Sequence, residues 1–135
     1  MKLNQATDYA FRAVLYLSQC SGEEVVEARV IADHEHIPMR FMLRILLKLV
    51  RAGIVKSFRG VRGGYALAKT PRQITMRDVI EAIEGPICIS SCLHAPDGCS
   101  KGNPAQCSVH EVLLSIQRVM NEKLEECNFE TLRNL

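Results

Sequence analysis

Three cysteines and a histidine lie close together in the second half of the chain and are the residues best suited to chemistry. Cys92, Cys99 and Cys107 are separated by six and seven residues, and His110 stands three positions after Cys107. Thiolates are soft ligands that suit iron–sulfur clusters or zinc. The segment is rich in Gly, Pro, Asp, Asn and Ser, and its few apolar residues cannot form a core. The pattern therefore predicts a loop that a metal centre organises.

The residues alone leave the kind of metal centre open. A structural zinc ion held by Cys92, Cys99, Cys107 and His110 has the right ligand number, but zinc sites usually show cysteine pairs about two to four residues apart. A thiol–disulfide switch and unligated cysteines are the other interpretations. Cys88, four positions before Cys92, is a further candidate ligand or redox partner.

The charge of the chain is divided unevenly between its halves. Residues 1–75 hold 12 Lys and Arg against 6 Asp and Glu, a net charge of +6, whereas residues 76–135 hold 5 against 9, a net charge of −4. The two values sum to the +2 of the whole chain. A basic first half indicates a polyanionic partner.

Hydrophobic periodicity and turn residues predict a mainly α-helical chain with one small β-hairpin. A winged helix-turn-helix followed by a long dimerisation helix is the fold class that this order indicates. Thr75 with Asp78, and Ser108 with Glu111, are predicted to cap their helices as capping boxes. Helices are expected over residues 5–19, 28–34, 39–52, 75–85 and 108–126, and the hairpin strands over 54–58 and 65–68.

Six cations stand where a winged helix would meet double-stranded DNA. Four of them, Arg40, Arg44, Lys48 and Arg51, fall on one face of the predicted helix 39–52. The first two are placed for base edges or phosphates of the major groove, and the last two for the DNA backbone. At the predicted hairpin tip, Arg59 and Arg62 could enter a minor groove or contact phosphate. The alternative is a protein-binding winged helix whose charge confers solubility.

Several classes of protein are not expected. No apolar run approaches the length of a membrane span, and the N-terminal stretch has no features of a signal peptide, so a cytoplasmic protein without membrane contact is expected. Six cysteines in such a protein favour metal or redox chemistry over disulfides. The sequence shows no catalytic triad pattern, phosphate loop or paired acid–base site, so it does not predict an enzyme.

The hairpin and its surroundings resemble a known family. "SFRGVRGGYALAK", preceded by "LKLVRAGIVKS" and followed by "ITMRDVIEAIEG", is similar to the bacterial winged-helix iron–sulfur regulators that include IscR, NsrR and RirA. The opening "MKLNQATDYAFRAVLYL" and the three-cysteine loop before a long helix extend the resemblance over nearly the whole chain. It implies a homodimer on a partly palindromic operator, with one iron–sulfur cluster per subunit that controls DNA affinity.

The resemblance also implies two alternative ligand sets. Cys92, Cys99 and Cys107 match the cluster cysteines of the family. His110 matches the histidine of IscR-type members, which bind 2Fe–2S. Asp8 matches the aspartate with which NsrR-type members reach the partner subunit's 4Fe–4S cluster, and the likeness of "TDYAFR" to the NsrR-type opening favours Asp8. The cysteine spacing departs from the five and five of many members, which leaves the cluster type open.

The prediction is therefore a homodimeric transcriptional regulator that senses redox state, nitric oxide or iron–sulfur status. Residues 1–84 form the DNA-binding winged helix, 85–107 the cluster-binding loop, and 108–135 the dimerisation helix and tail. A cluster-free thiol-redox or zinc-stabilised regulator is the leading alternative. An iron–sulfur scaffold or carrier is the third, and it would not need a basic wing.

Overall fold

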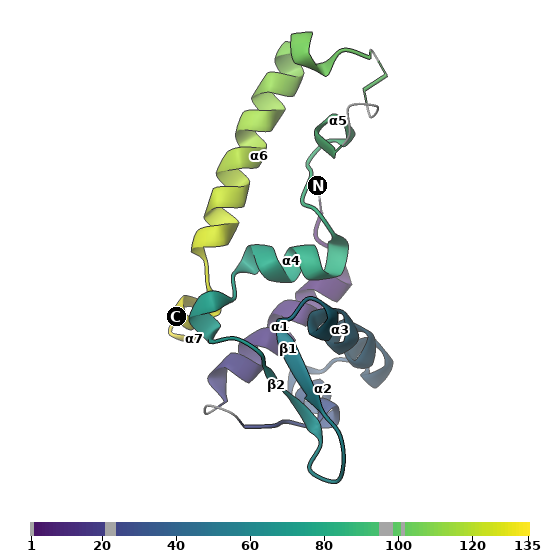
Figure 1. The fold of residues 1–135 in the computed structure, drawn as a ribbon, viewed down its shortest axis with the longest axis vertical. Helices are drawn as coiled ribbons and strands as arrows, with labels where there is room; N and C mark the ends of the chain where they lie inside the picture. The colour runs from purple at the N-terminus through teal and green to yellow at the C-terminus, as the bar shows by residue number, and fades with distance from the viewer. Residues whose placement is uncertain (1, 21–23, 95–98, 101) are drawn as a thin grey trace.

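The computed structural model describes residues 2–20, 24–94, 99–100 and 102–135. The described chain forms a winged helix-turn-helix from which one long helix extends (Figure 1). Its longer elements are α1 (Gln5–Gln19), α2 (Ala28–Glu35), α3 (Met39–Arg51), β1 (Val55–Phe58), β2 (Gly64–Leu67), α4 (Met76–Glu84), α6 (Ser108–Glu126) and α7 (Phe129–Arg133). Single turns form η1 (Pro71–Gln73), α5 (Ser91–His94) and η3 (Pro104–Gln106). The predicted fold class is confirmed.

The core of the winged helix is aliphatic and comes mainly from α1 and α3. Asn4 starts α1 by accepting a hydrogen bond from the backbone N–H of Thr7 at 2.8 Å. α3 ends before Gly53, whose φ of +77° is the left-handed conformation expected after a helix. The apolar side chains of these two helices that are at most 4% exposed are Ala10, Ala13, Val14, Leu17, Met42, Ile45, Leu46 and Leu49.

The wing is a two-stranded antiparallel hairpin that the chain before α2 extends by one bridge. Its register runs from Val55 opposite Leu67 to Phe58 opposite Gly64. Tyr65 exchanges backbone hydrogen bonds of 2.7 and 2.8 Å with Val26. A Cβ on Gly64 would lie 2.5 Å from the carbonyl oxygen of Val26, so only glycine allows this close approach.

The structure confirms one of the two capping boxes predicted for the second half of the chain. The capping box at the start of α4 is confirmed, because Thr75 accepts from Asp78 N and Asp78 accepts from Thr75 N. The predicted capping box of Ser108 and Glu111 is wrong. Cys107 occupies the N-cap position of α6 and makes no side-chain capping bond, so Ser108 is already the first helical residue.

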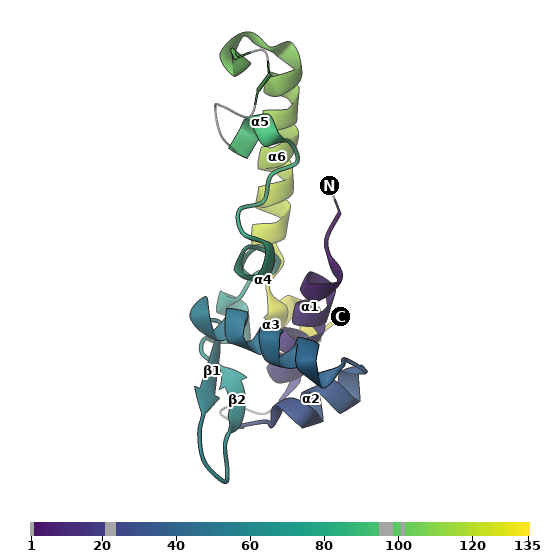
Figure 2. The ribbon, with the colours of Figure 1, turned by 90° about the vertical axis from the view of Figure 1, so that its right-hand side faces the viewer.

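The chain after α6 returns to the winged helix. Phe129 of α7 is 1% exposed and lies in the same core as α1 and α3. Backbone bonds from Met76 N to Cys127 O (2.9 Å) and from Phe129 N to Ile74 O (3.0 Å) fasten this return. The N-terminal end of α6 therefore lies away from the module, and α5 packs alongside this helix (Figures 1 and 2). Within the described residues, no helix combines the length and apolarity needed to span a membrane.

Candidate functional site

The outward face of α3 is the first candidate site. α3 lies across one side of the module with the wing next to it (Figure 2). Its buried residues face the core, which leaves Arg40, Arg44, Lys48 and Arg51 exposed on the opposite side, as the periodicity predicts. The guanidinium carbon of Arg40 lies 4.9 Å from the centre of the Phe41 ring. In the part of the chain that the structure describes, no carboxylate pairs with these four cations, so their charge is available to a polyanion.

Lys48 differs from its neighbours because it has a partner within the fold. Its Nζ donates a hydrogen bond of 3.2 Å to the carbonyl oxygen of Ile83, in the last turn of α4. A cation at this end of a helix satisfies a free carbonyl and complements the helix dipole. Lys48 therefore ties α3 to α4, a role that the sequence does not reveal.

The wing tip presents the second pair of predicted DNA-binding residues. Arg59 and Arg62 are both exposed in the loop between β1 and β2, which forms the outermost end of the hairpin (Figure 1). Gly60 adopts a φ of +100°, which an L side chain rarely adopts. The loop can therefore approach a surface closely at this glycine, which lies between the two arginines in the sequence.

The cysteine segment brings one predicted pair of ligands together. Cys92 Sγ in α5 lies 3.3 Å from His110 Nδ1 in the first turn of α6, and 3.3 Å from Ser90 Oγ. Cys99 and Cys107 are free, partly exposed thiols. Residues 95–98 and 101 of the loop lie outside the described residues.

An iron–sulfur cluster is the group that the family resemblance implies for this segment. The donor chemistry fits, because the cluster cysteines are unpaired thiols and an imidazole already lies beside Cys92. Among the described residues, no three His, Cys, Asp or Glu side chains are grouped closely enough to hold a metal ion. Binding would therefore have to draw Cys99 and Cys107 toward the pair of Cys92 and His110.

The remaining thiols and the second ligand candidate lie apart from this pair. Cys88 Sγ is 3.9 Å from His94 Nδ1, at the entry to the loop. Asp8, in the first turn of α1, has a side chain that is 57% exposed and accepts hydrogen bonds from Arg12 at 2.5 and 3.1 Å. Within one chain, the structure does not bring Asp8 to the cysteines.

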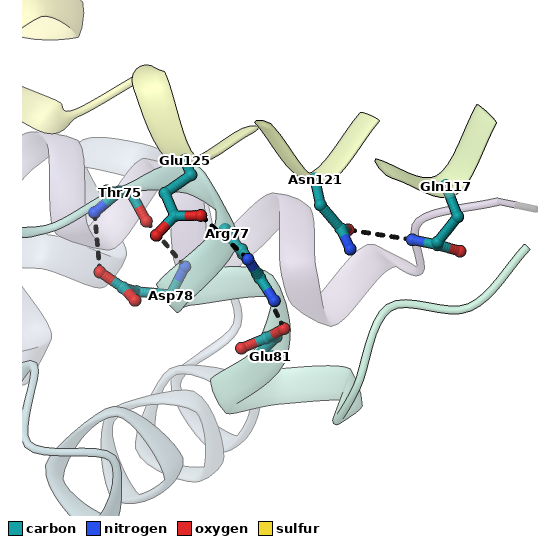
Figure 3. Close-up of polar contacts among 7 residues, drawn as sticks. All are labelled: Thr75, Arg77, Asp78, Glu81, Gln117, Asn121 and Glu125. Carbon is teal, nitrogen blue, oxygen red and sulfur yellow. Dashed lines mark hydrogen bonds and ion pairs between the residues drawn. The ribbon is translucent and has the colours of Figure 1, made fainter. Parts of the chain in front are cut away.

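A polar seam joins α6 to α4 and to the start of the cysteine segment. Gln117, 6% exposed, accepts from the backbone N–H of Ile89 at 2.8 Å and donates to Asn121 at 2.9 Å. Further along α6, Glu125 accepts from Arg77 of α4 at 2.9 Å (Figure 3). The pKa of Arg77 is raised, first by its hydrogen bond to Glu81 and also by Glu125.

Sequence inspection missed this seam, although a signal was present. Gln117, Asn121 and Glu125 recur at every fourth position, so they form one polar stripe along a helix. The stripe lies beside the apolar face that the periodicity of residues 108–126 predicts. A polar row beside an apolar row on one helix indicates a second packing surface.

A carboxylate also fastens the end of α4 to the start of α1. Glu84 accepts a hydrogen bond from the hydroxyl of Thr7, which is fully buried, and one of 3.4 Å from the backbone N–H of Asn4. Together with the contact from Lys48 to Ile83, this fixes the last turn of α4 against α1 and α3. The cysteine segment begins directly after that turn.

Comparison with known proteins places this architecture among bacterial regulators. The chain is 38% identical over 84 residues to an HTH-type transcriptional regulator of Synechocystis, covering 62% of this chain but only 57% of the relative. It is 34% identical over 122 residues to an rrf2-like HTH-type regulator of Rhodobacter capsulatus, covering 84% and 80% of the two chains. It is also 34% identical over 104 residues to the regulator IscR of Cereibacter sphaeroides, covering 76% and 65%.

Solved structures agree in fold over the whole chain. CymR of B. subtilis, described as the global cysteine regulator, superimposes with a TM-score of 0.80 at 26% identity, covering 99% of this chain and 97% of CymR. T. potens IscR gives a TM-score of 0.76 at 25% identity, covering 98% and 85%. The Rrf2 family, described as iron-dependent transcriptional regulators, matches residues 3–134. The chain therefore belongs to the Rrf2 family of DNA-binding transcriptional regulators.

Proposed function

We propose that this regulator is a homodimer whose affinity for its operator is controlled by an iron–sulfur cluster held by Cys92, Cys99 and Cys107. The observation that carries the proposal is the contact of 3.3 Å between Cys92 and His110, which joins two predicted ligands from separate elements. Bound there, the cluster would supply a centre sensitive to redox state, nitric oxide or iron–sulfur supply. Residues 85–107 then form the sensing segment between the DNA-binding module of residues 1–84 and the dimerisation region of residues 108–135.

The DNA contacts in this proposal come from two elements. Arg40 and Arg44 reach base edges or phosphates in the major groove, and Arg51 reaches the backbone. Arg59 and Arg62 of the wing engage the minor groove or the phosphates beside it. Their exposure and the excess of positive charge in the first half support this assignment. Lys48 would contact the backbone only by giving up its bond to Ile83.

The proposed dimer interface is the apolar side of α6. Four apolar side chains of α6 are exposed: Val109, Val112, Ile116 and Val119. Two of them, Ile116 and Val119, line a shallow groove together with Met120 and Leu124. An apolar strip along a helix that leaves its own module needs a covering surface. A second copy of the same helix supplies one of matching length, as in other symmetric dimers.

The fourth ligand divides the proposal into two variants. His110 belongs to the same chain as Cys92 and already touches it. Asp8, which the sequence resemblance favours, would have to come from the partner subunit and leave Arg12. We assign His110 on the strength of its contact, and treat Asp8 as the variant that a direct comparison must test.

Coupling to DNA follows from where the sensing segment is attached. Ile89 is held by Gln117 of α6, and the turn before it is held to α1 and α3 by Glu84 and Lys48. Binding of a cluster to Cys92, Cys99 and Cys107 would therefore act on the packing of α4 against the helix that carries the proposed DNA contacts. The two states differ in the orientation of the DNA-binding modules, so a ligand that favours one state shifts operator affinity.

The test is an absorption spectrum of the protein purified without oxygen, together with iron and sulfide analysis. We expect a brown protein with absorption bands at roughly 400 nm, where thiolate-bound iron–sulfur clusters absorb. The analysis should find iron and sulfide in equal amounts. Cys92→Ala should lose the bands, whereas Cys20→Ala should keep them. A colourless protein with one zinc ion per subunit would refute the cluster.

A cluster-free thiol regulator is the second candidate, and the likeness to CymR favours it. In that case the cysteines form a disulfide on oxidation and no metal binds. The same preparation distinguishes the two: metal-free protein whose operator affinity changes reversibly with a dithiol reductant and a peroxide supports the thiol regulator.

The two candidate fourth ligands predict opposite results for the loss of cluster in His110→Ala and in Asp8→Ala. If His110 is a ligand, His110→Ala should lower the cluster content or shift its absorption bands more than Asp8→Ala does. Loss of a donor bound directly to the metal weakens a metal site strongly, whereas loss of the pair between Asp8 and Arg12 costs little on the surface. Greater loss in Asp8→Ala would instead assign the carboxylate of the partner subunit.

A further inference from the structure

Two leucines are exposed on the outward side of α3, next to its basic stripe. Leu43 is 45% exposed and Leu47 is 49% exposed, whereas the four core-facing residues of this helix (Met42, Ile45, Leu46 and Leu49) are at most 3% exposed. The two leucines are four positions apart and therefore neighbours on the helix surface. They form an apolar ridge that points away from the core.

Cations lie along one side of this ridge. Leu43 lies one turn after Arg40, and Leu47 lies one turn from both Arg44 and Arg51. The helix contains no Asp or Glu. A helix face with an apolar row beside a row of cations, and without carboxylates, complements a surface that carries both phosphates and apolar groups.

Folding does not require leucine at these positions. Exposed helix positions are filled equally well by Lys, Gln or Glu, whose helix propensities are close to that of Leu. A single exposed leucine is ordinary, but two adjacent ones at the middle of a binding face lower solubility without adding to the core. Their side chains are therefore available for recognition.

We propose that Leu43 and Leu47 read thymine methyl groups in the operator. The C5-methyl group of thymine is the apolar feature that the major groove offers, and apolar side chains are the groups that contact it. The arginines hold the helix in the groove through phosphates and guanine edges, and the leucines select T·A base pairs between those contacts. This inference rests on the proposed placement of α3 in the major groove.

The test uses a duplex that the full-length protein selects from random double-stranded DNA. Each thymine of the bound site is replaced in turn by deoxyuridine, which removes the methyl group and keeps the pairing. For the wild-type protein, at least one replacement per half-site should lower the affinity about fourfold, the fold-change expected for one buried methyl group.

The variants Leu43→Ala and Leu47→Ala complete a double-mutant cycle with these duplexes. Each variant should bind the thymine site about fourfold more weakly, and the sensitive deoxyuridine replacement should then cost it nothing further. Val30→Ala is the matched control, because Val30 is also 45% exposed but lies on α2. It should retain the full sensitivity of the wild type to deoxyuridine.

Four results separate the failures. If deoxyuridine leaves the affinity of the wild-type protein unchanged at every position, the leucines do not read thymine methyl groups. The proposal also fails if the affinity losses from a leucine variant and from deoxyuridine are additive in the double-mutant cycle. Leucine variants with unchanged DNA affinity would overturn it as well. Arg40→Ala and Arg51→Ala test the proposed placement of α3 in the major groove. If neither variant weakens DNA binding, α3 does not lie in the groove.

Discussion

At the scale of single residues, the cysteines of this chain have different surroundings. Cys20 closes α1, where its Sγ lies 3.4 Å from the carbonyl oxygen of Tyr16. Burial raises the pKa of the Cys20 thiol, and the nearby carboxylate of Glu24 raises it further. The thiol form is therefore favoured, and Cys20 is suited to packing.

Cys20 should react slowly with iodoacetamide. The thiolate is the reactive form, so a raised pKa lowers the reactive fraction at about pH 7.5 and moves the rise of the rate to higher pH. Alkylation of Cys20, followed by mass spectrometry, is expected to be several-fold slower in the folded protein than in urea. An equal rate in both states would show that the fold does not protect this thiol.

Lys48 and Arg51 should respond differently to removal of their charge. Arg51→Met should lower the slope of log affinity against log salt concentration by about 0.9 if Arg51 neutralises one phosphate. Lys48→Met should leave this slope unchanged and lower the free energy of unfolding by about 1 kcal/mol, because it removes the bond to Ile83. Titrations at several salt concentrations and urea unfolding measure both. A reduced salt slope in Lys48→Met would assign Lys48 to the DNA instead.

At the scale of elements, the seam between α4 and α6 determines where the cysteine segment begins. Gln117 supplies the acceptor for Ile89 N, while Glu125 and Arg77 add an ion pair nearer the module. That pair is largely exposed and contributes little stability by itself. The buried amide of Gln117 is the stronger constraint on the segment.

Gln117→Leu should loosen the segment without unfolding the module. The N–H of Ile89 would lose its partner, which costs about 1 kcal/mol locally. Amide hydrogen exchange should become faster over residues 86–94 and stay unchanged in α1 and α3. Gln19→Leu, at an exposed position of α1, is the control and should show neither effect. Unchanged exchange at Ile89 in Gln117→Leu would contradict this role of the amide.

At the scale of the whole molecule, α6 separates two surfaces with different tasks. Its polar stripe faces α4 and its own chain, and its apolar side is exposed. The C-terminal return through Phe129 anchors the helix to the core of the winged helix. A proposed partner on the apolar side would therefore be rigidly connected to the DNA-binding face.

Val119→Glu should convert the proposed dimer into a monomer. A carboxylate introduced into an apolar helix interface loses its hydration without gaining a partner. Sedimentation equilibrium should show the monomer mass at micromolar concentration, and operator affinity should fall at least about tenfold because both half-sites are no longer bound together. Arg118→Glu introduces the same group on the other side of α6 and should remain dimeric. A dimeric Val119→Glu would place the interface elsewhere.

The sequence by itself determined the elements whose signals are local. The bounds of α1 and α3, the hairpin around its glycines and the capping box of Thr75 and Asp78 follow from periodicity, turn residues and caps within a few positions. Local side-chain and backbone interactions specify these features, so tertiary contacts had little to change. The distribution of charge likewise predicts that the first half of the chain carries the DNA-binding face.

Only the tertiary structure decided which distant residues meet. Cys92 reaches His110 across 18 positions, Ile89 reaches Gln117 across 28, and Lys48 reaches the carbonyl of Ile83 across 35. Such contacts depend on how α4 and α6 pack, and no periodicity within one element encodes them. The same reason explains why Lys48 looked equivalent to Arg51 in sequence: both side chains are exposed, but Lys48 is also bonded to the carbonyl oxygen of Ile83.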